Sequence, residues 1–343
     1  MMLDCAWLLR AALALLPALC FLGALLVLDS YKLVRPRRVV GMLAAGGAMA
    51  GISYCISYCI GFAMLQATGL GFPAYSRFVA PLVEESLKAA VVVALIRTRR
   101  IGFLSDAALL GYAVGTGFAT IENLYYLDRL AAAPIGVWVV RGFGTAILHG
   151  GAQAIFAALA LANTDRRGEA DARALLPPLL LAVAVHAAFN SFVLPPIQQT
   201  LLVLVLMPPL MLWVFKRSER AVEGWIGAGF DTDGELMRLL ESGTFSQSHA
   251  GQYLVALRDR FAPEIVFDLF CYLRLYAELA LRAKGLLLMR ENGIAAPPCA
   301  EVGEKLRELR HLEHSVGPTA LHTLQPLMHI SRRDLWQMRM LGE

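Results

Sequence analysis

Seven apolar runs, each close to the length of a bilayer-spanning helix, occupy the first 215 residues of this 343-residue chain. A helix needs about 20 consecutive apolar residues to cross the hydrocarbon core. The runs cover residues 9–28, 39–66, 78–96, 101–127, 136–162, 174–193 and 196–215. We therefore predict an all-α fold, a polytopic membrane helix bundle of about seven spans. We expect the first run to be a retained span and not a cleaved signal peptide.

Charge divides the chain after Phe215. Residues 1–215 carry 25 charged side chains, whereas the shorter stretch 216–343 carries 33. This predicts a transmembrane domain over 1–215 and a helical cytoplasmic domain over 216–343. Six scattered cysteines exclude a secreted disulfide scaffold, and a dispersed net charge of +4 gives no reason to expect nucleic acid as a partner. The expected tail helices are 234–242, 247–261, 264–290, 301–314 and 332–341, with apolar side chains such as Phe267 packing in a small bundle or against a partner.

Basic residues lie in every second connection between the spans, which predicts the orientation of the chain. Thirteen Lys and Arg residues fall on one side, against only Arg77 and Arg129 on the other. We expect the N-terminus outside, the C-terminus in the cytoplasm, and a multi-pass location in the inner (cytoplasmic) membrane. The thirteen residues are Lys32, Arg35, Arg37, Arg38, Arg97, Arg99, Arg100, Arg166, Arg167, Arg173, Lys216, Arg217 and Arg220.

A small set of ionisable side chains lies inside the spans, where each costs about 2.5–3.5 kcal/mol on insertion scales. Four helices of alternating direction place Glu84, Glu122, His149 and His186 roughly 8 to 20 Å below the outer surface. Overlapping depths indicate one polar cavity that opens outward. The full set is Glu84, Glu85, Lys88, Asp106, Glu122, Arg141, His149 and His186.

The spacing of these residues restricts which of them share a helix face. Glu84 and Lys88 are i and i+4, in the order that favours an ion pair, and Glu85 points about 100° away. His186 and Asn190 have the same i, i+4 spacing, as do His149 and Gln153. Two histidines with a carboxylate can bind zinc and leave a position for water, while a further glutamate takes a proton from that water.

Other unusual residues in the spans have structural interpretations. We expect Asp106 and Arg141 to be interfacial or paired. Small residues in the second and fourth spans predict close helix packing. They are Gly41, Gly46, Gly47, Gly51, Gly111, Gly115 and Gly117.

The order of the polar motifs resembles the PrsW family of membrane-embedded proteases, within the larger group that includes the CAAX-processing endopeptidases. The motifs are Glu84-Glu85-x-x-Lys88, Phe118-x-x-x-Glu122-Asn123, His149, and His186-x-x-x-Asn190, on four successive predicted helices over about 78–193. The Glu-Asn pair fits PrsW better than the CAAX branch, where a histidine is usual. The resemblance implies an intramembrane metalloprotease that cuts a single-span protein, such as an anti-sigma factor, on its extracytoplasmic side.

By this resemblance the paired glutamates and the two histidines are catalytic or metal-binding. Our hypothesis assigns a Zn²⁺ ion to Glu122, His149 and His186, and makes Glu84 or Glu85 the general base. Asn123 or Asn190 would donate to the developing oxyanion, a role worth about 3–4 kcal/mol. Lys88 would keep one glutamate charged. The expected partners are a single-span membrane substrate, the lipid bilayer and a cytoplasmic partner of the tail.

Three alternatives remain at this point. The first is a metal-free glutamate-type endopeptidase, in which the histidines orient the water. The second is a proton-coupled transporter or a ligand-binding membrane protein, since such proteins also line their pathways with Glu and His. The third is a catalytically silent scaffold that acts through the tail. A structural role is common for a single intramembrane Glu–Lys pair or a single deep His or Asn.

Overall fold

The computed structural model describes residues 5–61, 66–67, 71–130, 132–294, 300–324, 327–328 and 332–342. These residues form helices and no strands, as predicted for a polytopic helical bundle. The chain divides into two compact units, residues 1–219 and 220–343, and each is described by itself.

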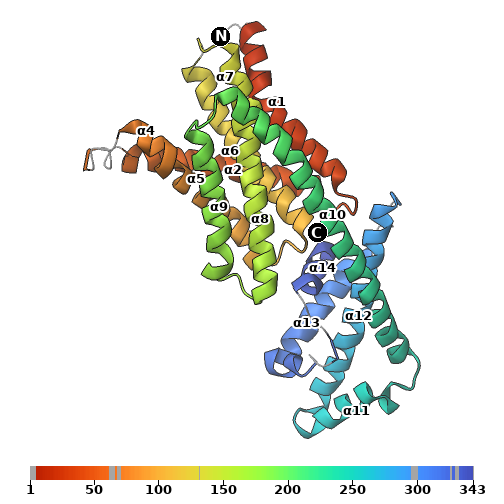
Figure 1. Ribbon diagram of the computed structural model, residues 1–343. Helices are drawn as coiled ribbons and strands as arrows, with labels where there is room; N and C mark the ends of the chain where they lie inside the picture. Colours follow the sequence, from red (N-terminus) through yellow and green to blue (C-terminus); the bar gives the residue numbers. More distant parts are fainter. Residues whose placement is uncertain are drawn as a thin grey trace. The chain divides into compact units, whose positions relative to one another are not determined.

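The first unit contains the predicted spans (Figure 1). Its elements are α1 (Cys5–Leu28), α2 (Pro36–Ile56), the π-helical η1 (Ser57–Gly61), α4 (Phe72–Ala74), the π-helical η2 (Tyr75–Val79), α5 (Ala80–Arg97), α6 (Leu104–Arg129), α7 (Ile135–Val139), the π-helical η3 (Val140–Ala146), α8 (Ile147–Arg167), α9 (Ala172–Asn190) and the first part of α10 (Pro196–Glu241), whose residues from 220 on belong to the second unit. Residues 62–65, the end of the second predicted span, lie outside the described part.

Six helices in the described part of the chain are long and apolar enough to cross a membrane. They begin at Cys5, Pro36, Leu104, Ile135, Ala172 and Pro196. The predicted span at α5 is missing from this set because it carries Glu84, Glu85, Lys88 and Arg97 within 18 residues. The cost of placing these charges in lipid has to be offset by protein neighbours.

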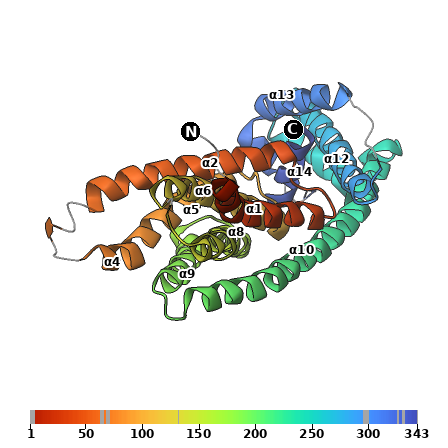
Figure 2. The same cartoon turned by 90° about the horizontal axis from the view of Figure 1, so that it is seen from above.

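Helix α6 lies at the centre of the first unit, between α2 and α8 (Figure 2). It is buried along most of its length. A Cβ atom on Gly117 would lie 2.0 Å from the carbonyl oxygen of Leu43 in α2, and one on Gly115 would lie 2.1 Å from that of His149 in α8. Glycine therefore allows both backbones to approach α6, as predicted for the small residues of these spans. Gly41 and Gly51 have open space around them, so the prediction is wrong for these two.

Local capping sets several helix ends. The Asp106 carboxylate accepts hydrogen bonds from the backbone N–H groups of Gly102 and Phe103 at the start of α6, which satisfies donors that the helix leaves unpaired. Gly168 follows α8 with φ +82°, a left-handed conformation that glycine adopts without strain. Asp171 then caps α9 by accepting from Ala174 N at 2.8 Å.

The second unit is helical, as expected, with its own apolar core. After the end of α10 it contains η4 (Phe245–Gln247), α11 (His249–Ala256), η5 (Leu257–Asp259), α12 (Pro263–Glu291), α13 (Ala300–His322) and α14 (Arg332–Gly342). One local expectation was wrong, because the seventh span and the first tail helix are one continuous helix, α10. Phe267 on α12 is exposed and does not pack within the bundle, so its packing against a partner stays a prediction.

Candidate active site

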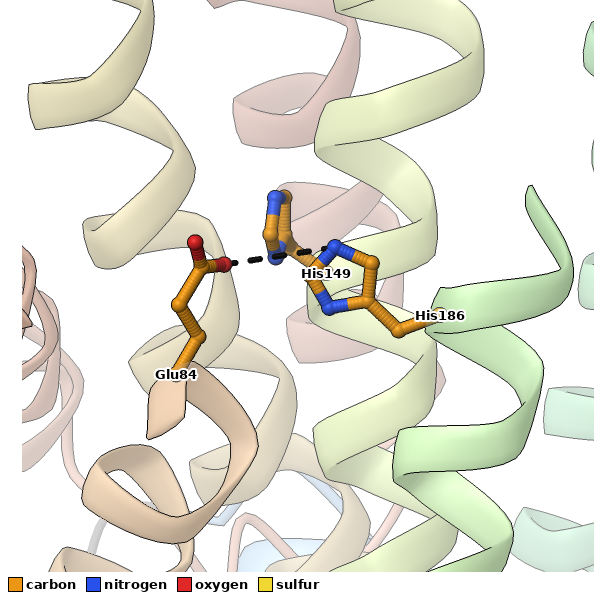
Figure 3. A group of neighbouring side chains, drawn as sticks. All are labelled: Glu84, His149 and His186. Atoms are coloured by element: carbon orange, nitrogen blue, oxygen red, sulfur yellow. Dashed lines mark ion pairs between the residues drawn. The ribbon is translucent and has the colours of Figure 1, made fainter. Parts of the chain in front are cut away.

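Three helices bring Glu84 of α5, His149 of α8 and His186 of α9 to one point. Figure 3 shows the three side chains directed toward one another. One ligand atom from each lies within 4.8 Å of the other two. Both histidines are buried, while Glu84 keeps 18% of its side chain exposed. The side chains that the sequence placed at similar depths therefore do converge, and one of them faces an open side.

Glu85 lies on the buried side of α5 and is fully hydrogen-bonded. Its Oε1 accepts from Lys88 Nζ and from His186 Nδ1, the latter at 2.8 Å. Its Oε2 accepts from Gln153 Nε2 at 2.6 Å, and the side chain is 0% exposed. The expected Glu84–Lys88 ion pair is therefore wrong, because Lys88 pairs with Glu85 at i, i+3 instead. Three donors on one carboxylate make Glu85 an anchor for its neighbours.

The bond to Glu85 assigns the tautomer of His186. An ionised carboxylate only accepts hydrogen bonds, so Nδ1 of His186 carries the proton and Nε2 keeps its lone pair. This Nε2 lies 3.9 Å from Glu84 Oε2. Two electron-rich atoms therefore face each other across the centre of the site.

Lys88 and Glu122 assign the tautomer of His149 in the same way. Lys88 Nζ lies 2.9 Å from His149 Nδ1, and an ammonium group can only donate. His149 Nε2 therefore carries the proton and donates to Glu122 Oε2 at 3.1 Å. Each histidine thus has one nitrogen held by a carboxylate. This arrangement is typical of metal-binding histidines, whose ring orientation is set by such partners.

A family model describing PrsW family intramembrane metalloproteases matches residues 35–214, which include all four motifs. The chain belongs to the PrsW family. It is therefore a membrane-embedded endopeptidase of a metalloprotease family. No curated protein and no solved structure matches the chain.

In this PrsW protein Glu122 lies behind His149, and Glu84 is the carboxylate that joins the two histidines. Sequence reasoning placed Glu122 among the metal ligands, and that assignment stays a prediction. Its Oε1 lies 3.2 Å from the guanidinium of Arg141, so both of its oxygens have partners within the protein.

The two asparagines of the PrsW motifs are not brought into this group of three. Asn123 donates through Nδ2 to the carbonyl of Ala14 at 2.7 Å. Asn190 donates through Nδ2 to the carbonyl of Ser76 at 3.2 Å. Each amide gives one of its two N–H groups to backbone, and an oxyanion role for either asparagine stays a prediction.

The donor set of the PrsW site fits a cation. The site contains three carboxylates and two cations. The carboxylates belong to Glu84, Glu85 and Glu122, and the cations are Lys88 and Arg141. With both imidazoles neutral the group carries an excess of one negative charge. One Glu oxygen and two His nitrogens are also the donors that catalytic zinc prefers.

Two residues of the PrsW site were not assigned these roles from sequence. Gln153 shares the i, i+4 spacing with His149, but nothing in the sequence identifies its partner as Glu85 on another helix. Arg141 was expected to be interfacial or paired, and its partners are Glu122 and Asn123. Both are polar residues within apolar runs of the sequence, and this was the signal that could have identified them.

Proposed function

We propose that this protein hydrolyses a peptide bond in a single-span membrane protein, with Glu84 taking the proton from the attacking water. The observation that carries the proposal is the convergence of Glu84, His149 and His186, with a carboxylate behind each imidazole. Glu84 is better suited to be the base than Glu85, because it is partly exposed and accepts none of the three hydrogen bonds that hold Glu85.

The residues that would hold a zinc ion are His149 through Nδ1, His186 through Nε2 and Glu84 through one carboxylate oxygen. When bound, zinc makes water a stronger nucleophile and polarises a carbonyl oxygen. The second oxygen of Glu84 is then available for the proton. Glu85 and Glu122 support the tautomers that leave a lone pair on His186 Nε2 and on His149 Nδ1.

A metal-free glutamate peptidase is the second candidate, favoured by one contact. The Lys88 ammonium lies against His149 Nδ1, which is the nitrogen that a metal ion would need. In this version Glu84 activates the water alone and the histidines orient it.

We infer that the substrate resembles an anti-sigma factor and is cut on the extracytoplasmic side of the inner membrane. The basic connections support an outside N-terminus, which puts the partly exposed Glu84 and Glu122 in the outer half of the bilayer. The tail, with nearly balanced charge, is proposed to bind a cytoplasmic partner. An exposed Phe267 agrees with a docking role.

The decisive experiment compares cleavage of a tagged single-span protein in membranes that hold the wild type, Glu84→Gln or Glu169→Gln. Glu169 is an exposed glutamate between α8 and α9 and serves as the matched control. We expect cleavage by the wild type and the control, and none by Glu84→Gln. Cleavage by all three would rule out the proposal.

Zinc is tested separately on purified protein. Chelation should abolish cleavage and added Zn²⁺ should restore it, with metal present in the wild type and lost in His186→Ala. Full activity in metal-free protein would select the glutamate-only candidate.

A further inference from the structure

Arg141 is a partly buried cation within the span that carries His149. It belongs to η3, eight residues before His149, and 14% of its side chain is exposed. Its Nε donates to Asn123 Oδ1 at 2.8 Å, and its Nη2 lies 3.2 Å from Glu122 Oε1. Its flat face lies 3.8 Å from the ring centre of Tyr126. These contacts hold different parts of the guanidinium group and so determine its orientation.

The partners of Arg141 connect it to the centre of the site and to helix α1. Glu122 uses Oε1 for Arg141 and Oε2 for the Nε2–H of His149. Asn123 uses Oδ1 for Arg141 and Nδ2 for the Ala14 carbonyl in α1. A chain of polar contacts therefore runs from the backbone of α1 through Arg141 to the imidazole of His149.

We propose that Arg141 is a positioning residue that acts on His149 through Glu122. It fixes the Glu122 carboxylate, and this carboxylate accepts the Nε2–H of His149 and orients the ring, while Lys88 at Nδ1 supports the same tautomer. A buried ion pair is weak evidence for stability alone, because apolar residues of similar volume are often as stable. The inference rests on the proposed function, since it gives His149 a task that needs one tautomer.

Lysine would not replace arginine in this role. The planar guanidinium reaches Asn123 and Glu122 with different nitrogens while stacking on Tyr126. A lysine ammonium is a single point of charge on a flexible stem and cannot keep this geometry. Arg141→Lys keeps a positive charge beside Glu122 but loses the geometry, so it should retain more activity than Arg141→Met and less than the wild type.

Purified variants Arg141→Met, Arg141→Lys, Glu122→Gln and the Glu122→Gln/Arg141→Met double variant test the proposal. Arg129→Met is the matched control, because Arg129 is 65% exposed and lies over the neighbouring Tyr125 ring. We expect Arg141→Met to lower kcat by roughly 10–100-fold, the usual effect of losing a residue behind a metal-binding histidine, with KM unchanged. The control should keep wild-type kcat.

The double variant separates positioning from independent effects. If Arg141 acts through Glu122, the double variant should be no slower than Glu122→Gln alone. It also leaves neither charge buried alone, so it can be measured if Arg141→Met fails to fold. Multiplied losses in the double variant would overturn the proposal.

Nitrogen NMR of the His149 imidazole gives a readout independent of activity. The wild type should show the proton on Nε2, and Arg141→Met should shift the Nε2–H signal, because the hydrogen bond to Glu122 is loosened while Lys88 still donates to Nδ1. Wild-type kcat and an unchanged His149 spectrum in Arg141→Met, while Glu84→Gln is inactive, would overturn the role of Arg141 alone. Activity in Glu84→Gln would instead contradict the proposed function.

Discussion

His186 donates from Nδ1 to Glu85 Oε1 at 2.8 Å, and the opposite nitrogen of the same ring lies 3.9 Å from Glu84 Oε2. Two consecutive glutamates on α5 therefore act on opposite sides of one imidazole. They can do so because neighbouring residues on a helix point about 100° apart. The buried glutamate orients the ring, and the other keeps 18% of its side chain exposed.

This relationship predicts different outcomes for two similar substitutions. Glu85→Gln should lower the free energy of unfolding by roughly 3–5 kcal/mol, because it leaves the Lys88 ammonium buried without its anion. Glu84→Gln should abolish cleavage with little change in stability. Denaturant unfolding in detergent, beside the cleavage assay, distinguishes them. Equal stability of the two variants would contradict the division of roles.

Close packing of α6 against α8 predicts a strong effect of a single methyl group. Gly115→Ala would place Cβ 2.1 Å from the His149 carbonyl oxygen, so the helices must move apart. We expect a loss of about 1–3 kcal/mol in stability and reduced cleavage. Gly51→Ala is the control, because nothing lies within 4 Å of its added Cβ. Thermal unfolding of both variants checks the prediction, and a Gly115→Ala protein as stable as the control would contradict it.

The second unit contains a buried cation whose removal should affect the tail alone. Lys284 Nζ donates to Asp233 Oδ2 at 2.7 Å and to Gln337 Oε1 at 3.3 Å, and it lies over the Trp225 ring. Lys284→Met should make residues 220–343 more sensitive to limited proteolysis, because Asp233 loses its cation.

The matched control for this prediction is Lys305→Met, since Lys305 pairs with Glu278 at a more exposed position. The control should change protease sensitivity less. Both variants should cleave the single-span substrate at the wild-type rate. A loss of cleavage in Lys284→Met with an intact tail would show that this cation serves the membrane unit.

The expected orientation is open to a direct test. Reporter fusions after residues 35, 98, 168 and 220 should report the cytoplasm, and fusions near 72, 132 and 195 should report the outside. The reversed pattern would place Glu84 and Glu122 in the inner half of the membrane. An extracytoplasmic cut would then be excluded.

Sequence patterns predicted the helices, the spans and the motif residues, because apolar length and periodicity are local properties. They did not predict that Lys88 pairs with Glu85, or that Glu84 lies with both histidines while Glu122 contacts His149 at Nε2. Which helix face meets which neighbour depends on the rotation and tilt of each helix, which its own residues do not specify. The continuous α10 was missed for another reason, since its apolar run ends while its backbone remains helical.

The π-helical turn η3 changes the direction in which the side chains before it point around the helix axis. On a uniform α-helix, the eight residues from Arg141 to His149 would place these side chains about 80° apart. The wider turns of Val140–Ala146 rotate the chain less per residue, which brings Arg141 toward the side that His149 faces. If the same residues of η3 adopted plain α-helical geometry, the 80° offset would return and Arg141 would turn away from Glu122. Deleting one residue at the same time would reduce the spacing to seven and bring the two side chains back to within about 20°, so the number of residues in this turn matters as much as their identity.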